Sequence, residues 1–191
     1  DDTVTIIRKV FTSNMEALQA TARLLSASEM AKAIDYLANA KQIHFWGLGG
    51  SSPIAFDAHH KFFKLGTPCI AYSDSHMQAM AAALLVPEDV VVAISHSGST
   101  RDIVQNLTIA QDVGAKTIAI TSHAKSPVAG IADVVLCVHA SETAFKLEPA
   151  SSRIAHLSVV DALAVGVAMR RREAVTERLA NARKALIDKR Y

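Results

Sequence analysis

Five short runs of apolar residues, separated by segments with helical spacing, constrain the fold of this 191-residue chain more than any other feature. The runs are apolar throughout rather than alternating, which is typical of strands covered on both faces of a parallel sheet. They are Ile43–Leu48, Cys69–Tyr72, Val90–Ser95, Thr117–Thr121 and Val134–Val138. The spacing between them predicts helices over residues 52–65, 75–84 and 101–113, and a short turn over 126–130. The predicted fold class is therefore α/β, a three-layer sandwich around a five-stranded parallel sheet.

Helical patterns precede and follow the predicted sheet. Apolar residues recur every three or four positions from Val4 to Leu25, and a second helix begins at Ser28 and ends near Asn39. Helical spacing returns after Ser151, and a last amphipathic helix carries the stripe Val175, Leu179, Ala182, Leu186. With no repeat or linker, we expect a single domain over residues 1–191. It comprises a leading helix (1–27), an α/β core (28–150) and C-terminal helices (151–191).

Composition excludes several classes of protein. Half of the residues are hydrophobic and 20% are charged, which excludes a disordered tail, a collagen-like fibre and a low-complexity linker. No stretch approaches about 18 uninterrupted apolar residues, so we expect a soluble chain with no membrane partner. Cys69 and Cys137 lie far apart without metal or redox spacing, which favours a reducing cytoplasm. The chain starts at Asp1 without a methionine, so we expect a domain of a longer protein.

The formal net charge of +2 hides an uneven distribution. Residues 170–190 hold eight basic and three acidic side chains, a charge of +5, which leaves 12 basic and 15 acidic residues (−3) elsewhere. A mildly acidic body is not a broad electrostatic footprint for nucleic acid. The basic tail shares its helix with an apolar stripe, so we interpret it as the solvated face of a docked helix rather than a DNA-binding patch.

Hydroxyl side chains and glycines gather where the predicted strands end. The segments are Gly47–Ser52, Ser73–Ser75, Ser95–Thr100, Thr121–His123 and, at the helix after the fifth strand, Ser151–Arg153. The carboxyl ends of parallel strands meet at one edge, where ligands bind in open α/β sheets. Hydroxyls, bare backbone N–H groups and helix N-termini suit a phosphate dianion. For any one of these loops, an ordinary helix N-cap is an equally good interpretation.

Nucleotide cofactors and metal ions do not fit this pattern. The dinucleotide fingerprint needs a third glycine where Ser52 stands, and the phosphate loop of nucleotide triphosphatases needs a lysine that residues 42–60 lack. No histidine pair at i, i+4 and no Cys/His cluster has metal-ligand spacing. We therefore expect no cofactor and no metal, and a small phosphorylated metabolite as the ligand.

Two of these segments resemble a known family. Gly47–Ser51 after the first strand, with Ser95–Thr100 after the third, is similar to the sugar isomerase (SIS) domain, and the likeness spans roughly residues 28–170. The leading helix, Ser152–Ala155 and Val160–Leu163 are further similar to the effector domains of RpiR-type bacterial transcription regulators, in particular the HexR-type repressors of hexose catabolism. This resemblance implies a flavodoxin-like sheet, phosphosugar binding and a separate helix-turn-helix domain, which this sequence does not contain. HexR-type members respond to 2-keto-3-deoxy-6-phosphogluconate.

The resemblance also implies roles for individual residues. The hydroxyls of Ser51, Ser95, Ser97 and Thr100 would hold the phosphate. Backbone N–H groups around Gly50, Ser52 and Gly98 would assist them. A carboxylate after the fifth strand, Glu148 rather than Glu142, would bind sugar hydroxyls. Arg153 would meet a sugar-acid carboxylate, and a structural or subunit ion pair is the alternative for it.

Two functions remain open at this stage, a ligand sensor and a phosphosugar isomerase. An aldose–ketose isomerase needs a base with a pKa near neutrality beside the first two sugar carbons. The candidates are Glu148, Glu142, His96, His76 and His60, and no pairing in the sequence marks any of them as catalytic. We favour the sensor, predict no catalytic residue and interpret His96 as structural. Apolar surface on the terminal helices predicts a homodimer or larger homo-oligomer.

Overall fold

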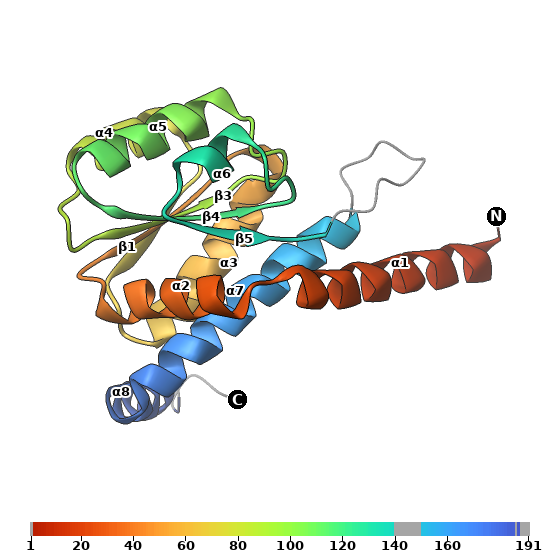
Figure 1. The fold of residues 1–191 in the computed structure, drawn as a ribbon. Coiled ribbons are helices and arrows are strands. Elements are labelled where there is room, and N and C mark those ends of the chain that lie inside the picture. Colours follow the sequence, from red (N-terminus) through yellow and green to blue (C-terminus); the bar gives the residue numbers. More distant parts are fainter. Residues whose placement is uncertain (1, 140–149, 186, 188–191) are drawn as a thin grey trace.

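A five-stranded parallel sheet forms the centre of the molecule (Figure 1). The computed structural model describes residues 2–139, 150–185 and 187. The strand order is β2-β1-β3-β4-β5. The strands are β1 (Ile43–Gly47), β2 (Cys69–Tyr72), β3 (Val90–Ile94), β4 (Lys116–Thr121) and β5 (Val134–Cys137). The predicted fold class is confirmed, and each predicted strand lies within one residue of an observed one.

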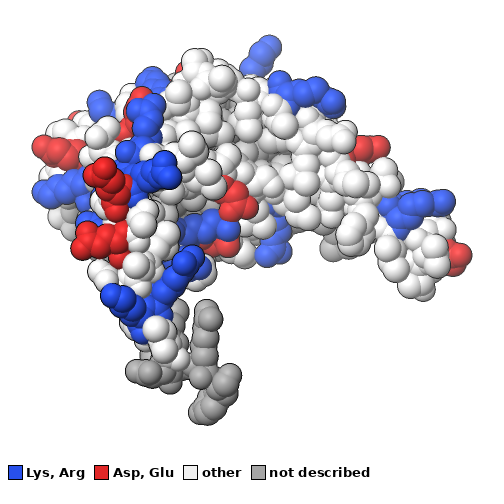
Figure 2. Space-filling view, turned by 90° about the horizontal axis from the view of Figure 1, so that it is seen from below, with Lys and Arg blue, Asp and Glu red and all other residues white. Residues whose placement is uncertain are grey.

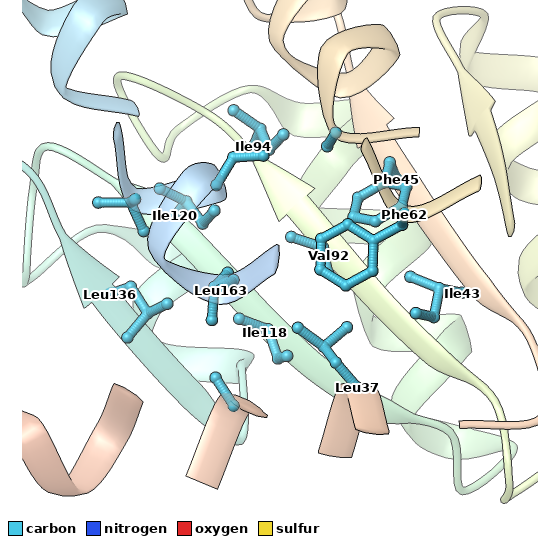
Figure 3. Close-up of a cluster of buried hydrophobic side chains, with 14 of the residues drawn as sticks. Leu37, Ile43, Phe45, Phe62, Val92, Ile94, Ile118, Ile120, Leu136 and Leu163 are labelled. Atoms are coloured by element: carbon cyan, nitrogen blue, oxygen red, sulfur yellow. The ribbon is translucent and has the colours of Figure 1, made fainter. Parts of the chain in front are cut away.

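Successive side chains of each strand point to opposite faces of the sheet, and in the central strands β1 and β3 both sets are buried. In β3, Val90, Val92 and Ile94 belong to one apolar cluster and Val91 and Ala93 to the other. In the larger cluster, Phe45 of β1 packs against Phe62 of α3 (Ser52–Lys64), with ring centroids 5.2 Å apart (Figure 3). Continuous apolar runs in the sequence therefore indicated double coverage correctly.

Helices cover the sheet in two layers (Figure 1). One layer holds α2 (Ala27–Asn39), α3 and α7 (Ala150–Arg170), and the other holds α4 (Ser75–Ala83), α5 (Arg101–Asp112) and α6 (Pro127–Ile131). Side-chain caps fix where several of these helices begin. Ser26 accepts a hydrogen bond from the Glu29 N–H at the start of α2, which satisfies a backbone donor that the helix itself cannot.

The first helix, α1 (Thr3–Leu24), extends beyond the sheet (Figure 1). Its second half packs against α7 and buries Ala17 and Thr21. The large apolar residues of its first half are exposed within this chain: Val4, Ile6, Ile7, Val10 and Phe11. The periodicity predicted this helix correctly. The predicted oligomer, which would cover the exposed apolar residues of α1, stays a prediction.

Helix α7 is long and apolar enough to cross a membrane by length and composition alone. The core helix of a soluble protein passes the same test, and 44% of the apolar window of α7 is already buried inside the chain. It packs against α1, α2 and α3, and it buries Val159, Leu163 and Val167. Its Asp161 also pairs with Lys61 of α3 at 2.6 Å. We therefore interpret α7 as a core helix.

The basic C-terminal segment docks only through its first half. In α8 (Arg172–Lys184), Val175 is buried and Leu179 is half-buried, whereas Ala182 is exposed. The predicted stripe is thus right for the first two residues and wrong for Ala182, and Leu186 lies outside the described residues. Arg178 donates to the carbonyl oxygen of Gly66, which ties the helix to the loop after α3. Figure 2 shows basic and acidic side chains intermingled around this end of the molecule, as on an ordinary solvated surface.

Candidate functional site

A cavity of about 560 Å³ opens at the carboxyl edge of the sheet. It lies beside the ends of β1 and β3, which are neighbours although their following connections lead to opposite layers. This is the topological switch point at which open α/β sheets bind ligands. Fourteen residues line it: Leu48, Gly49, Gly50, Ser51, Ile54, Ile94, Ser95, His96, Ser97, Thr100, Ile103, Ser152, Arg153 and His156.

Most of the predicted ligand-binding residues meet in this cavity. They are Gly50, Ser51, Ser95, Ser97, Thr100 and Arg153. Ser52 and Gly98 are absent from the lining. Glu148 and the less favoured Glu142 lie outside the described residues. The structure therefore brings together side chains that are about 100 positions apart in the sequence, as the carboxyl-edge argument anticipated.

The first loop is a tight turn between β1 and α3. A Cβ on Gly47 would lie 2.5 Å from the carbonyl oxygen of Ser51, so the turn closes only around a glycine. Both hydrogen-bond donors of Ser52 are used inside this turn. Its hydroxyl donates to Gly47 O at 3.0 Å, and its N–H donates to Gly49 O. The predicted contribution of Ser52 to anion binding therefore does not fit the geometry. Ser51 takes the position that faces the cavity.

The second loop arranges two serine hydroxyls by backbone hydrogen bonds. The Ser95 hydroxyl accepts from the Gly98 N–H at 3.1 Å, and the Ser97 hydroxyl accepts from the Ser99 N–H at 3.3 Å. A hydroxyl that accepts still has its own hydrogen to donate. Both serines line the cavity and keep a hydroxyl hydrogen that a ligand can accept. The Gly98 N–H donates within the loop to the Ser95 hydroxyl and carbonyl oxygens, and its predicted contact with a ligand stays a prediction.

The helices that begin at the cavity lack the side-chain caps that others have. Ser51 and Thr100 occupy the N-cap positions of α3 and α5, and neither side chain makes a capping hydrogen bond. In contrast, Asp74 caps α4 through the Met77 N–H, and Ser126 caps α6 through the Ala129 N–H. The ordinary N-cap interpretation therefore holds away from the cavity and fails at it. The positive end of α5 remains available to an anion, whereas at the start of α3 the Ser52 N–H already donates to Gly49 O and Pro53 has no N–H.

The third wall is the first two turns of α7, which present Ser152, Arg153 and His156. Residues at i and i+4 share one face of a helix, which explains why Ser152 and His156 line the same cavity. Arg153 is exposed and makes no ion pair with any described residue. The predicted alternative, an ion pair within the chain, has no support among the described residues. A guanidinium at the rim can bind a planar carboxylate with two hydrogen bonds.

His156 is the site residue that the sequence argument missed. Its side chain is 1% exposed, and its Nδ1 lies 2.8 Å from the carbonyl oxygen of Ser152. The pKa of His156 is lowered from 6.5 to about 4, mainly by burial and to a smaller extent by the neighbouring His96. The ring is therefore neutral near pH 7. The i, i+4 relation to Ser152 was the available signal for it.

His96 also lines the cavity. Its Nδ1 lies 3.0 Å from the Ser122 hydroxyl. Its ring centroid lies 5.9 Å from that of His123 and 6.1 Å from that of His156. The loops after β3 and β4 and helix α7 thus meet around one imidazole. This packing agrees with the structural role that the sequence suggested.

The described lining contains no aspartate, glutamate or lysine, and Arg153 is its one permanent cation. An anion would therefore be held by hydroxyls and helix ends. Nowhere in the described part of the chain do three His, Cys, Asp or Glu side chains come close enough to hold a metal ion. This donor set matches a phosphate group, whose oxygens accept hydrogen bonds from neutral donors.

The buried imidazole predicts a loss of stability in acid. An unfolded His156 takes up a proton near pH 6.5, whereas the folded chain resists protonation until about pH 4. Unfolding therefore becomes easier as pH falls through this window, by at most ~1.4 kcal/mol per pH unit. Urea titrations at pH 7, 6, 5 and 4.5 measure this slope. The His156→Gln variant should have a shallower slope, while the lowered pKa of His44, which is due to burial, contributes equally to both proteins. Identical slopes would contradict the prediction.

Comparison with known proteins gives a consistent family. The SIS domain model matches residues 36–166. An uncharacterized HTH-type transcriptional regulator of Caldanaerobacter subterraneus subsp. tengcongensis is 39% identical over 186 residues, covering 97% of this chain and 66% of that protein. The HTH-type transcriptional regulator RpiR of Escherichia coli is 37% identical over 163 residues, covering 85% of this chain and 55% of that protein. This chain thus spans roughly half to two thirds of these relatives.

A solved structure repeats the fold. The Vibrio vulnificus NanR protein complexed with ManNAc-6P superimposes with a TM-score of 0.91, covering 97% of this chain and 70% of that one. The sequence identity is 22%, so this likeness concerns the fold alone. The helices added at both ends of the sheet fall within the superimposed part, since almost the whole chain is covered.

Proposed function

The chain belongs to the SIS domain family, and from that premise we propose that it is the phosphosugar-sensing effector domain of a bacterial transcription regulator. The observation that carries this proposal is the cavity at the β1/β3 switch point, where Ser51 and Thr100 begin helices without capping them. DNA would be contacted by a helix-turn-helix domain elsewhere in the longer protein. The names of the regulator relatives support this, as does their greater length.

We further propose a sugar-acid phosphate as the effector. The hydroxyls of Ser51, Ser95, Ser97 and Thr100 would take the phosphate, and Arg153 at the rim would take a carboxylate. 2-Keto-3-deoxy-6-phosphogluconate carries both groups at opposite ends, and we propose it or a close relative. A regulator with this effector would act in the cytoplasm as a repressor of carbohydrate catabolism. The NanR structure supports this proposal, because that protein has the same fold and is complexed with ManNAc-6P.

An aldose–ketose isomerase is the alternative, and the chemistry of the described lining disfavours it. That reaction needs a general base with a pKa near the working pH. Among the described lining residues the candidate bases are His96 and His156, and burial lowers the pKa of His156 to about 4, which makes it a weak base. Glu148 and Glu142 lie outside the described residues. Incubation with sugar phosphates in deuterated water, followed by NMR, separates the two functions. Proton exchange at an ordinary enzyme rate, about 1–1000 per second, would overturn the sensor proposal.

Ligand binding is predicted to stabilise the domain measurably. A ligand present at 100 times its dissociation constant adds about 2.7 kcal/mol to the free energy of unfolding. A thermal-shift screen of sugar phosphates and sugar-acid phosphates should therefore find compounds that raise Tm. The matched sugars without phosphate should not raise it. A shift that does not depend on the phosphate would contradict the proposed site.

We propose that two copies of the chain associate through apolar residues at the start of α1, including Val4, Ile7 and Phe11. Burying such a surface is favourable at about 25 cal/mol per Å² of apolar area. Sedimentation of the domain, compared with a Phe11→Glu variant, tests this. A monomeric wild-type domain would refute the association.

A further inference from the structure

One nitrogen of the His156 ring has no hydrogen-bond partner among the described residues. This atom, Nε2, is buried, and the side chain lines the cavity. A buried polar atom without a partner is unfavourable, and such atoms are rare in folded proteins. An orphaned polar atom in the wall of a ligand cavity therefore points to a partner that the chain itself does not supply.

The other nitrogen determines what kind of partner this must be. Nδ1 lies 2.8 Å from the carbonyl oxygen of Ser152, and a carbonyl oxygen only accepts hydrogen bonds. Nδ1 therefore carries the proton of the neutral ring. Burial keeps the pKa of His156 at about 4, so Nε2 stays unprotonated near neutral pH. Nε2 is consequently an acceptor, and its partner must be a donor.

This requirement excludes the two charged ends of the proposed ligand as partners. Phosphate and carboxylate oxygens accept hydrogen bonds, and they would repel the Nε2 lone pair. The phosphate would instead meet the donors of Ser51, Ser95, Ser97 and Thr100, and a carboxylate would meet Arg153 one turn earlier on α7. His156 therefore faces the middle of the ligand, where a sugar chain carries hydroxyl groups.

We propose that Nε2 of His156 accepts a hydrogen bond from a hydroxyl of the bound phosphosugar, and that this contact selects ligands with a hydroxyl at that position. The inference rests on the proposed phosphosugar function of the cavity. Nε2 is covered in the ligand-free chain, so the ring or its neighbours shift when the hydroxyl arrives. His96, whose ring centroid lies 6.1 Å away, is a neighbour that would have to adjust.

Calorimetric titration of three variants tests the contact. The probes are inorganic phosphate, 6-phosphogluconate and 2-keto-3-deoxy-6-phosphogluconate. His156→Leu removes the acceptor and should weaken the two sugar-acid phosphates by about threefold to tenfold, with phosphate unchanged. His156→Gln can place an amide oxygen near the position of Nε2 and should recover most of the affinity. His156→Asn is too short to do so and should behave like the leucine variant.

The outcomes separate this inference from the function on which it rests. If wild type binds neither phosphate nor either sugar-acid phosphate, the proposed function fails and the inference fails with it. If wild type binds the sugar-acid phosphates and His156→Leu binds them equally well, only the inference fails. Equal losses for phosphate and for the sugar-acid phosphates would assign His156 a structural role and would also overturn it.

Nitrogen NMR of the histidine ring gives a second test that does not depend on a variant folding. With ¹⁵N-labelled histidine at pH 7, His156 should give one protonated nitrogen, Nδ1, and one unprotonated nitrogen, Nε2. Adding the tighter sugar-acid phosphate should shift the Nε2 resonance toward that of a hydrogen-bonded acceptor, whereas inorganic phosphate should not. A proton on Nε2 in the ligand-free chain would overturn the proposal.

Discussion

Replacing Ser51 and Ser95 together with alanine is expected to weaken phosphosugar binding by about 100-fold or more while leaving the fold intact. Each serine supplies a hydroxyl donor at the cavity, from two different loops. A hydrogen bond to a charged group is worth about 1.5–3 kcal/mol, so losing two removes about 3–6 kcal/mol of binding free energy. The free energy of unfolding should change little. The Gly98 N–H donates to both the hydroxyl and the carbonyl oxygen of Ser95, so it keeps a partner when the hydroxyl is removed.

The measurement is calorimetric titration with the phosphosugar that gives the largest thermal shift. Ser99→Ala is the matched control, since Ser99 belongs to the second loop, is exposed and does not line the cavity. It should bind as wild type does. Unchanged affinity in the Ser51/Ser95 double variant, with circular dichroism showing a native fold, would refute the phosphate site.

Gly98→Ala should both destabilise the chain and abolish ligand binding. Gly98 has a φ of +63°, and a Cβ there would lie 2.1 Å from Ser126 Oγ and 2.4 Å from Ser126 Cβ. The left-handed backbone costs about 1–2 kcal/mol for a residue with a side chain, and forced overpacking costs about 1–3 kcal/mol more. We expect a loss of about 2–5 kcal/mol in the free energy of unfolding. Any relief of the clash moves the loop that carries Ser95 and Ser97.

Gly130→Ala is the control for this substitution. A Cβ on Gly130 meets no atom within 4 Å, and the residue lies inside α6. Alanine is favoured over glycine in a helix by about 1 kcal/mol, so this variant should be as stable as wild type or slightly more so. Urea unfolding of both variants gives the comparison. Equal stability of the two would show that the second loop tolerates a side chain at its turn.

The sheet was predictable because its signal is local. A run such as Val90–Ile94 is apolar at every position, and only a strand buried on both faces makes that pattern favourable. The contacts of the apolar face of α1 were not predictable in the same way. Periodicity shows that such a face exists, but the partner that covers it depends on where the helix lies. The burial of Ala182 was predicted wrongly for the same reason, because the later part of α8 is exposed at that residue.

The site was partly predictable for a geometric reason. Parallel strands end at one edge, so Ser51, Ser95 and Thr100 had to meet. The direction of individual N–H groups follows from turn conformation instead, and in the structure the N–H groups of Ser52 and Gly98 donate within their own loops. His156 was not predicted as a site residue because its role depends on which face of α7 meets the sheet edge. That orientation is set by packing against three other helices.

Helix α7 has a thermodynamic consequence for a regulator of the kind proposed. Its first turn forms one wall of the cavity, and its flank supports the second half of α1. A ligand that changes the resting position of α7 also changes the free energy of each orientation of α1, because both share one rigid element. Such a linkage is reciprocal. If the orientation of α1 governs DNA affinity, occupancy of the operator must alter the affinity for the metabolite by the same factor, so the promoter would in turn regulate its own sensor.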